Sequence, residues 1–175
     1  MILSFIAQKP GMILEYRSLA SNLRITYQTV SKYVEYLEKS FLIKLVYNYR
    51  GSPVARARKL KKAYLGSINL VSGFLDSERE LLEKLPQLAE NLVCLHLNTK
   101  WFWKKYVEID FYFKKIPIEV KYTEAEPDIK NLLLASKALK SKKIFVITKD
   151  IEQKEMQDDI EISYLPLWKF LLLPK

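Results

Sequence analysis

The sequence predicts an α/β protein of two modules, with a boundary near residue 65. Hydrophobic residues make up 49% of the 175 residues, which is enough for a packed core. Helical and strand-like patterns alternate along the chain. The charge is segregated, because residues 1–65 hold 12 Lys and Arg against 3 Asp and Glu, whereas residues 66–175 hold 17 of each. Two charge regimes favour two modules with different partners.

Helical patterns come first in the basic module. "ILSFIAQK" ends at Pro10-Gly11, and "EYRSLASNLR" carries apolar residues at helical spacing. "ITYQTVSKYVEYLEKS" follows, with Thr26 as the expected N-cap. The β-rich run "FLIKLVYNY", a turn at residues 50–53 and "ARARKLKKAYL" complete the module. Two helices joined by a short turn and followed by a β-hairpin are typical of a winged helix-turn-helix over residues 1–65.

The polar and basic side chains of this module predict that DNA is its partner. The outward side chains of its second paired helix could donate to base edges and phosphates: Tyr27, Gln28, Thr29, Ser31 and Lys32. The wing would add basic residues for phosphate contact, with no acidic residue among them: Arg50, Arg56, Arg58, Lys59, Lys61 and Lys62. The alternative is a winged helix that acts as a spacer between proteins, with a solvated basic face.

The second module begins with helical patterns and ends with a buried strand. "DSERELLEKL" has a capping-box spacing at Ser77 and Glu80, and Pro86 opens the helical stretch "PQLAENLVCLHLNTK". "DIKNLLLASKALKSK" is amphipathic and helical, and "KKIFVIT" reads as a buried strand. With the hairpin before them, these segments predict an α/β unit with a crossover connection.

The hairpin "EIDFYFKKIPIEVKY" carries charges on one predicted face. A two-residue loop at 114–115, or a four-residue loop in the same register, places Asp110 opposite Glu119 and Glu108 opposite Lys121. A three-residue loop would change this register. The opposite face would be an unbroken apolar surface: Ile109, Phe111, Phe113, Ile116, Ile118 and Val120.

Directly opposed side chains have Cβ atoms about 5 Å apart, so Asp110 and Glu119 could share one divalent cation. Lys121 points the same way and could hold an attacking water or a phosphate oxygen. Metal and lysine together are what phosphodiester hydrolysis requires. The alternative is an amphipathic hairpin with a wet face, on which Glu108 and Lys121 form an ordinary cross-strand ion pair.

The sequence has too few His and Cys residues for a His-rich metal site or a zinc finger. The single His96 lies in an apolar helical stretch, where we expect a structural role, and the lone Cys94 is expected in the core. A metal would therefore need carboxylate ligands, which favours Mg²⁺ or Mn²⁺. The sequence holds no P-loop motif. It also holds no membrane-spanning apolar run and no signal-peptide pattern, so we expect a cytoplasmic protein without a membrane partner.

"EID" followed by "EVK" resembles the PD-(D/E)XK signature of restriction-endonuclease-like and archaeal Holliday-junction-resolvase-like folds. The resemblance implies a restriction-endonuclease-like α/β domain with a mixed central sheet over residues 66–175. Its catalytic set would be Glu90, from "LAENLV", with Asp110, Glu119 and Lys121. On the same resemblance, Glu90, Asp110 and Glu119 would be ligands of Mg²⁺ or Mn²⁺.

A wider resemblance covers nearly the whole chain. "TVSKYVEYLEKSFLI", "LAENLVCLHL", "WFWKKYVEIDF", "IPIEVKY" and "YLPLWKFLL", in that order, resemble the C-terminal half of archaeal and bacterial AAA+-type ATPases. In these proteins a P-loop domain precedes a winged helix and a nuclease-like domain. The resemblance implies an ATPase domain upstream or in trans as a partner.

Three hypotheses about function follow. The chain is a Mg²⁺- or Mn²⁺-dependent DNA endonuclease, or it is a catalytically inactive DNA-binding and regulatory half of an ATPase. In the third, both modules are protein-interaction surfaces, with "WFWKKY" as an interface patch for a homodimer. The alternative for this segment is that Trp101 and Trp103, at strand spacing, lie in the core or on a sheet face.

Overall fold

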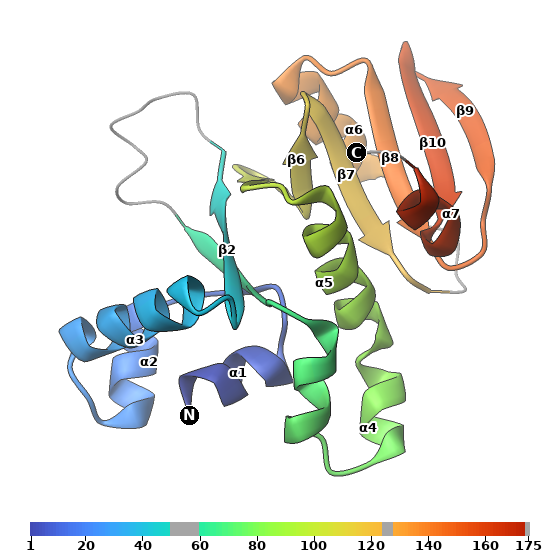
Figure 1. The fold of residues 1–175 in the computed structure, drawn as a ribbon. Coiled ribbons are helices and arrows are strands. Elements are labelled where there is room, and N and C mark those ends of the chain that lie inside the picture. Colours follow the sequence, from blue (N-terminus) through green and yellow to red (C-terminus); the bar gives the residue numbers. More distant parts are fainter. Residues whose placement is uncertain (50–59, 124–127, 174–175) are drawn as a thin grey trace.

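The computed structural model describes residues 1–49, 60–123 and 128–173 (Figure 1). The protein is a mixed α/β structure in which helices pack on two mixed sheets. The α/β class predicted from the sequence is therefore confirmed. Within the described residues, no helix is long and apolar enough to cross a membrane.

The basic third of the chain forms the three expected helices and two later strands, with an additional short strand, β1 (Met12–Ile13), that the sequence did not predict. The elements are α1 (Ile2–Gln8), β1, α2 (Tyr16–Leu23), α3 (Tyr27–Lys39), β2 (Ile43–Asn48) and β3 (Lys61–Leu65). Helix α3 begins where its capping residue predicts, because the Thr26 hydroxyl accepts a hydrogen bond from the Thr29 amide. Its inner face is apolar, and Val30 and Val34 are buried. The turn expected at residues 50–53 lies outside the described residues.

The first sheet crosses the predicted module boundary. Its order is β1-β3-β2-β4-β5, where β4 (Trp101–Lys104) and β5 (Glu108–Ile109) come from the second half of the chain. Strand β4 pairs with β2 in parallel, with Tyr47 opposite Trp101. Because hydrogen bonds join the two halves of the chain in one sheet, the boundary at residue 65 does not separate two sheets.

Between the two parts lie a 3-10 helix, η2 (Ile68–Phe74), and two α-helices, α4 (Glu78–Glu83) and α5 (Leu85–Leu97). The Ser77 hydroxyl accepts from the Glu80 amide and caps α4 as expected. Helix α5 has a proline in its first turn and ends at Asn98 in a left-handed conformation.

The second sheet has the order β6-β7-β8-β10-β9, and its strands are β6 (Phe111–Phe113), β7 (Ile116–Lys121), β8 (Lys143–Thr148), β9 (Gln153–Gln157) and β10 (Ile160–Pro166). Strands β7 and β8 are parallel and are connected through α6 (Lys130–Leu139). This is the crossover that the sequence predicts. Helix α7 (Leu167–Leu172) follows β10.

The β6–β7 hairpin has the predicted register. Phe111 pairs with Ile118 and Phe113 with Ile116, across a two-residue turn of Lys114 and Lys115. Both turn residues have positive φ, of 48° and 66°, which matches the twist of a tight hairpin. The register therefore brings the residues just before β6 beside the end of β7.

The hairpin is shorter than predicted, because the chain bends at Asp110 and β5 joins the first sheet. Two expectations are corrected by this bend. Glu108 pairs with Lys104 rather than lying opposite Lys121. Ile109 packs with the core that includes α6, whereas Phe111 packs with α5 and α7, so the apolar face is not continuous.

Helix α5 lies between the two sheets (Figure 1). Its residues Val93 and Cys94 share a core with Tyr64 of β3 and Phe111 of β6. A second core lies under α1–α3, and a third lies between the second sheet and α6. Because α5 contacts both sheets, it can present a polar side chain to residues from each of them.

Candidate functional site

Four carboxylates from three stretches of the chain, α5, residues 108–110 and β7, gather where α5 meets the two sheets. Glu90 comes from α5, Glu108 from β5, Asp110 from the bend after β5, and Glu119 from β7. We call these four residues the acidic cluster. The structure thus brings together the three acidic residues that the sequence predicts as a site, and adds Glu108.

Asp110 and Glu119 hold each other through the main chain. The Asp110 amide donates to Glu119 Oε2 at 3.2 Å, and the Val120 amide donates to Asp110 Oδ2 at 2.9 Å. Both carboxylates are largely buried, with side chains 14% and 11% exposed. The predicted proximity of Asp110 and Glu119 is therefore found, and main-chain contacts fix it.

Lys121 lies at the open end of the acidic cluster. Its Nζ is 2.8 Å from Glu119 Oε1, and 38% of the side chain is exposed. Burial lowers the pKa of Lys121, but the charge and hydrogen bond of Glu119, together with the charges of Asp110 and Glu90, raise the pKa overall. Lys121 is thus a charged donor within reach of solvent and next to two carboxylates.

Lys62 of β3 lies at the closed end of the cluster. Its Nζ is 3.3 Å from Glu90 Oε1, 2.9 Å from Glu108 Oε1 and 3.3 Å from Asp110 Oδ1, and only 4% of its side chain is exposed. Burial lowers its pKa, but these three carboxylates raise it overall. The expectation that Lys62 contacts phosphate is therefore corrected, because the ammonium is inside the protein.

Glu90 is enclosed by residues of the first sheet and the turn before it. The Tyr64 hydroxyl donates to Glu90 Oε1 at 2.5 Å, and a Cβ added at Gly11 would lie 3.0 Å from the same oxygen. Asn91 fixes α5 to β3, because its amide bonds both the N–H and the carbonyl of Leu65. These contacts hold Glu90 toward Lys62.

The carboxylates of Glu90 and Glu119 titrate at unusually high pH. Burial, and then the charge of Asp110, raises the pKa of each to about 7. Burial also acts to raise the pKa of Glu108. Lys62 and Lys104 together have the larger, opposite effect, so the pKa of Glu108 falls below its usual value. Partial protonation of Glu90 and Glu119 near neutral pH therefore reduces the negative charge of the cluster.

The donor set fits a hard divalent cation at one position. Asp110 and Glu119 are adjacent carboxylates, and carboxylate oxygens are the ligands that Mg²⁺ and Mn²⁺ prefer. In the part of the chain that the structure describes, no group of three or more Asp, Glu, His or Cys side chains is arranged to hold a metal ion. Lys62 lies between Glu90 and Asp110, with its Nζ 3.3 Å from an oxygen of each.

The residues predicted to contact DNA fall into three groups. Tyr27, Gln28 and Lys32 are exposed at the start of α3, and Thr29 and Ser31 are partly buried beside them. Lys61 is partly buried, with its Nζ 5.0 Å from the centre of the Tyr16 ring. Four further predicted contacts lie outside the described residues: Arg50, Arg56, Arg58 and Lys59.

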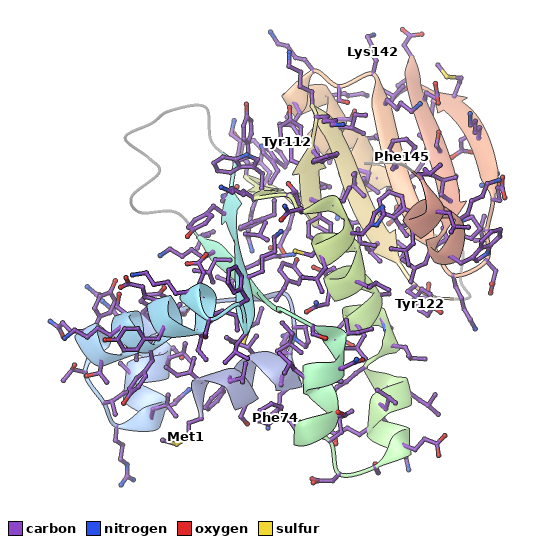
Figure 2. The ribbon with its side chains drawn as sticks, viewed as in Figure 1. Met1, Phe74, Tyr112, Tyr122, Lys142 and Phe145 are labelled. Carbon is purple, nitrogen blue, oxygen red and sulfur yellow. The ribbon has the colours of Figure 1, made fainter. Side chains whose placement is uncertain are left out.

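The residues expected to be structural pack into the interior or on its edge. Cys94 is buried as predicted, and His96 lies 5.3 Å from the ring of Phe170 on the apolar wall of a cavity of about 240 Å³. Trp103 is also buried. Tyr112, labelled in Figure 2, lies where β6 approaches the first sheet, and its ring centre is 4.6 Å from that of Tyr49.

Sequence reasoning missed the role of Lys62 and Tyr64 in the site. The available signal is the alternation within "KKAYL", which places Lys62 and Tyr64 on one face of a strand whose other face carries Ala63 and Leu65. A lysine that shares a face with a buried tyrosine needs a carboxylate partner. The sequence does not say which carboxylate.

The comparison with protein families gives one match. A family model described as a domain of unknown function, DUF8612, matches residues 1–78. No curated protein and no solved structure matches the chain. The family match covers Lys62 and Tyr64 and ends before the acidic cluster begins at Glu90.

Proposed function

We propose that this protein binds DNA and hydrolyses its phosphodiester bonds with the help of a divalent cation. The observation that carries the proposal is the convergence of Asp110, Glu119 and Lys121, with two main-chain hydrogen bonds holding the carboxylates together. Carboxylate, carboxylate and lysine at one solvent-accessible point supply the groups that phosphodiester hydrolysis needs.

The first part of the chain supports DNA as the substrate. The order α1-β1-α2-α3-β2-β3 supports the proposal of a winged helix, in which α3 would enter the major groove. Tyr27, Gln28 and Lys32 are exposed at its N-terminal end, where such helices contact base edges. The excess of nine positive charges in residues 1–65 would attract a polyanion.

The roles of the residues follow from their positions. Asp110 and Glu119 would hold Mg²⁺ or Mn²⁺, which supplies neutralisation of phosphate charge and a lowered pKa for bound water. Lys121 would orient the attacking water or donate to a phosphate oxygen, because its ammonium is partly exposed beside Glu119. The turn of Lys114 and Lys115 lies at the opposite end of β7 and takes no part in this chemistry.

Cleavage of supercoiled and branched DNA in Mg²⁺ and in Mn²⁺ tests the proposal. We expect metal-dependent cleavage that is lost in Asp110→Asn and Lys121→Met, while DNA binding by fluorescence anisotropy is retained. Lys114→Met is the matched control, because it removes a lysine from the same hairpin without touching the cluster. Cleavage that survives both cluster substitutions would refute the enzyme.

A second candidate function is DNA binding without catalysis, as the regulatory half of an AAA+-type ATPase. The observation that favours it is Lys62, whose ion pairs already neutralise part of the acidic cluster. It predicts DNA affinity that falls steeply with salt and no cleavage in either metal. Gln28→Ala and Lys32→Ala should weaken binding, whereas Lys39→Ala at the far end of α3 should not.

A further inference from the structure

Lys62 is a buried cation at a point where three carboxylates converge. Its Nζ lies 2.9–3.3 Å from oxygens of Glu90, Glu108 and Asp110. These carboxylates come from α5, β5 and the bend after β5, and the bend also contributes Asp110 to the open end of the site. The ammonium therefore makes contacts that a bound metal ion would otherwise make.

The position of Lys62 in the fold keeps its charge there. Lys62 lies on β3, the strand between β1 and β2, opposite Ile13 on one side and Val46 on the other. Its Nζ is also 5.6 Å from the centre of the Phe102 ring. A lysine surrounded in this way cannot reach water without a change in the sheet, and an unpaired charge at this depth is costly.

We propose that Lys62 is a resident cation that takes the place of one divalent metal ion and restricts the acidic cluster to a single metal position, at Asp110 and Glu119. The proposal rests on the proposed function only for the metal ion at Asp110 and Glu119. Glu90 would then be a partner of Lys62 and Tyr64 rather than a metal ligand. Lys62 determines how many cations the cluster accepts.

The geometry explains why one position is closed and the other open. Two cations at one position repel each other, so an ammonium that bridges Glu90 and Asp110 opposes a metal ion placed between the same two carboxylates. Glu119 makes no ion pair with Lys62 among the contacts of the described residues, and its lysine partner, Lys121, is partly exposed. A metal at Asp110 and Glu119 can displace an exposed lysine more easily than a buried one.

The test is Mn²⁺ binding in the absence of DNA, measured by calorimetry on the wild type and on Lys62→Met. We expect Lys62→Met to bind one more Mn²⁺ than the wild type, and to lose that ion when Glu108→Gln is added. Lys61→Met is the matched control, because Lys61 is the next residue of β3 but faces Tyr16 and Tyr47. An unchanged number of bound ions in a folded Lys62→Met protein overturns the proposal.

Glu90→Gln tests the same proposal in a chain that retains Lys62. If Lys62 is the cation at Glu90, the Mn²⁺ affinity of Glu90→Gln stays that of the wild type. If a metal ion replaces Lys62 there, loss of the ligand weakens Mn²⁺ binding about tenfold or more, and the proposal fails. This measurement decides the matter also where Lys62→Met does not fold.

These outcomes are separate from those of the proposed function. A protein that cleaves no DNA, but gains a Mn²⁺ ion in Lys62→Met, would lack the enzyme activity and still contain the resident cation. Conversely, DNA cleavage that depends on Lys121, together with a tenfold loss of Mn²⁺ affinity in Glu90→Gln, would support the enzyme and overturn the role of Lys62.

Discussion

The two ends of the acidic cluster contain the same chemical groups in different surroundings. At the closed end, a lysine with 4% of its side chain exposed contacts three carboxylates from two segments of the fold. At the open end, a lysine with 38% exposed contacts Glu119, two residues before it on the same strand. The first arrangement connects β3 with α5 and with the chain at and just after β5, whereas the second leaves charged groups near solvent.

The difference shows how similar ion pairs can have different consequences. Charges removed from water must remain paired, so the contacts of Lys62 become part of what holds β3, α5 and β5 together. Charges that keep contact with water are stabilised by it and can exchange partners. The open end is therefore the one suited to a ligand.

Removal of each lysine is the strongest way to test this comparison. We expect Lys62→Met to lower the free energy of unfolding by about 3 to 5 kcal/mol, because three carboxylates, of which Glu90 and Asp110 are largely buried, lose a buried cation. Lys121→Met should lower it by less than about 1 kcal/mol, because that pair is partly exposed. Urea unfolding at pH 7 measures both. Equal losses would show that the two ends do not differ.

A second prediction concerns pH. The pKa values of Glu90 and Glu119 are raised to about 7 in the folded protein, above the usual value in an unfolded chain. Between the usual pKa of a glutamate and pH 7, the folded state therefore binds more protons than the unfolded state. The free energy of unfolding is highest at the acidic end of this pH range and falls as the pH rises toward 7.

We expect the free energy of unfolding to fall by about 2 kcal/mol from pH 5 to pH 7.5. Glu119→Gln should flatten this slope, while Glu83→Gln on exposed α4 should leave it unchanged. Urea unfolding at a series of pH values measures the slope. A stability that rises over this range in the wild type would contradict the raised pKa values.

The smallest expected effect comes from Tyr64, which connects the closed end to the first sheet. Tyr64→Phe removes the hydroxyl that donates to Glu90, and should lower the free energy of unfolding by about 1 kcal/mol. Because that hydrogen bond lowers the pKa of Glu90, the pH slope should move to higher pH. Tyr106→Phe, at a side chain 86% exposed, is the control. No difference between the two variants would remove Tyr64 from the site.

Local patterns determined most of the secondary structure. Thr26 and Ser77 act where their short side chains can accept from the first turn of a helix, which depends on a few neighbouring residues. The register of the β6–β7 hairpin follows from alternation and from a two-residue turn. These features could be predicted because every contact that decides them lies within a few residues.

The site itself depended on contacts between distant residues. The pairing of Asp110 with Glu119 followed from the hairpin register, and the sequence alone predicted it. The bend at Asp110, which sends Glu108 to Lys104 and Ile109 to another core, depends on β4 pairing with β2 over fifty residues away. The pattern of residues in a strand does not predict which distant strand it will pair with.

Lys62 shows most clearly what the sequence alone could not predict. By composition it belongs to a basic run that predicts phosphate contact, and its neighbours in sequence are lysine and alanine. Only the packing of β3 against α5 and β5 turns its ammonium toward Glu90, Glu108 and Asp110. The sequence by itself determined that the chain has a basic third and a carboxylate hairpin. The tertiary structure decided that one of those basic residues belongs to the carboxylates, because burial requires a charge to find its partner wherever the fold places it.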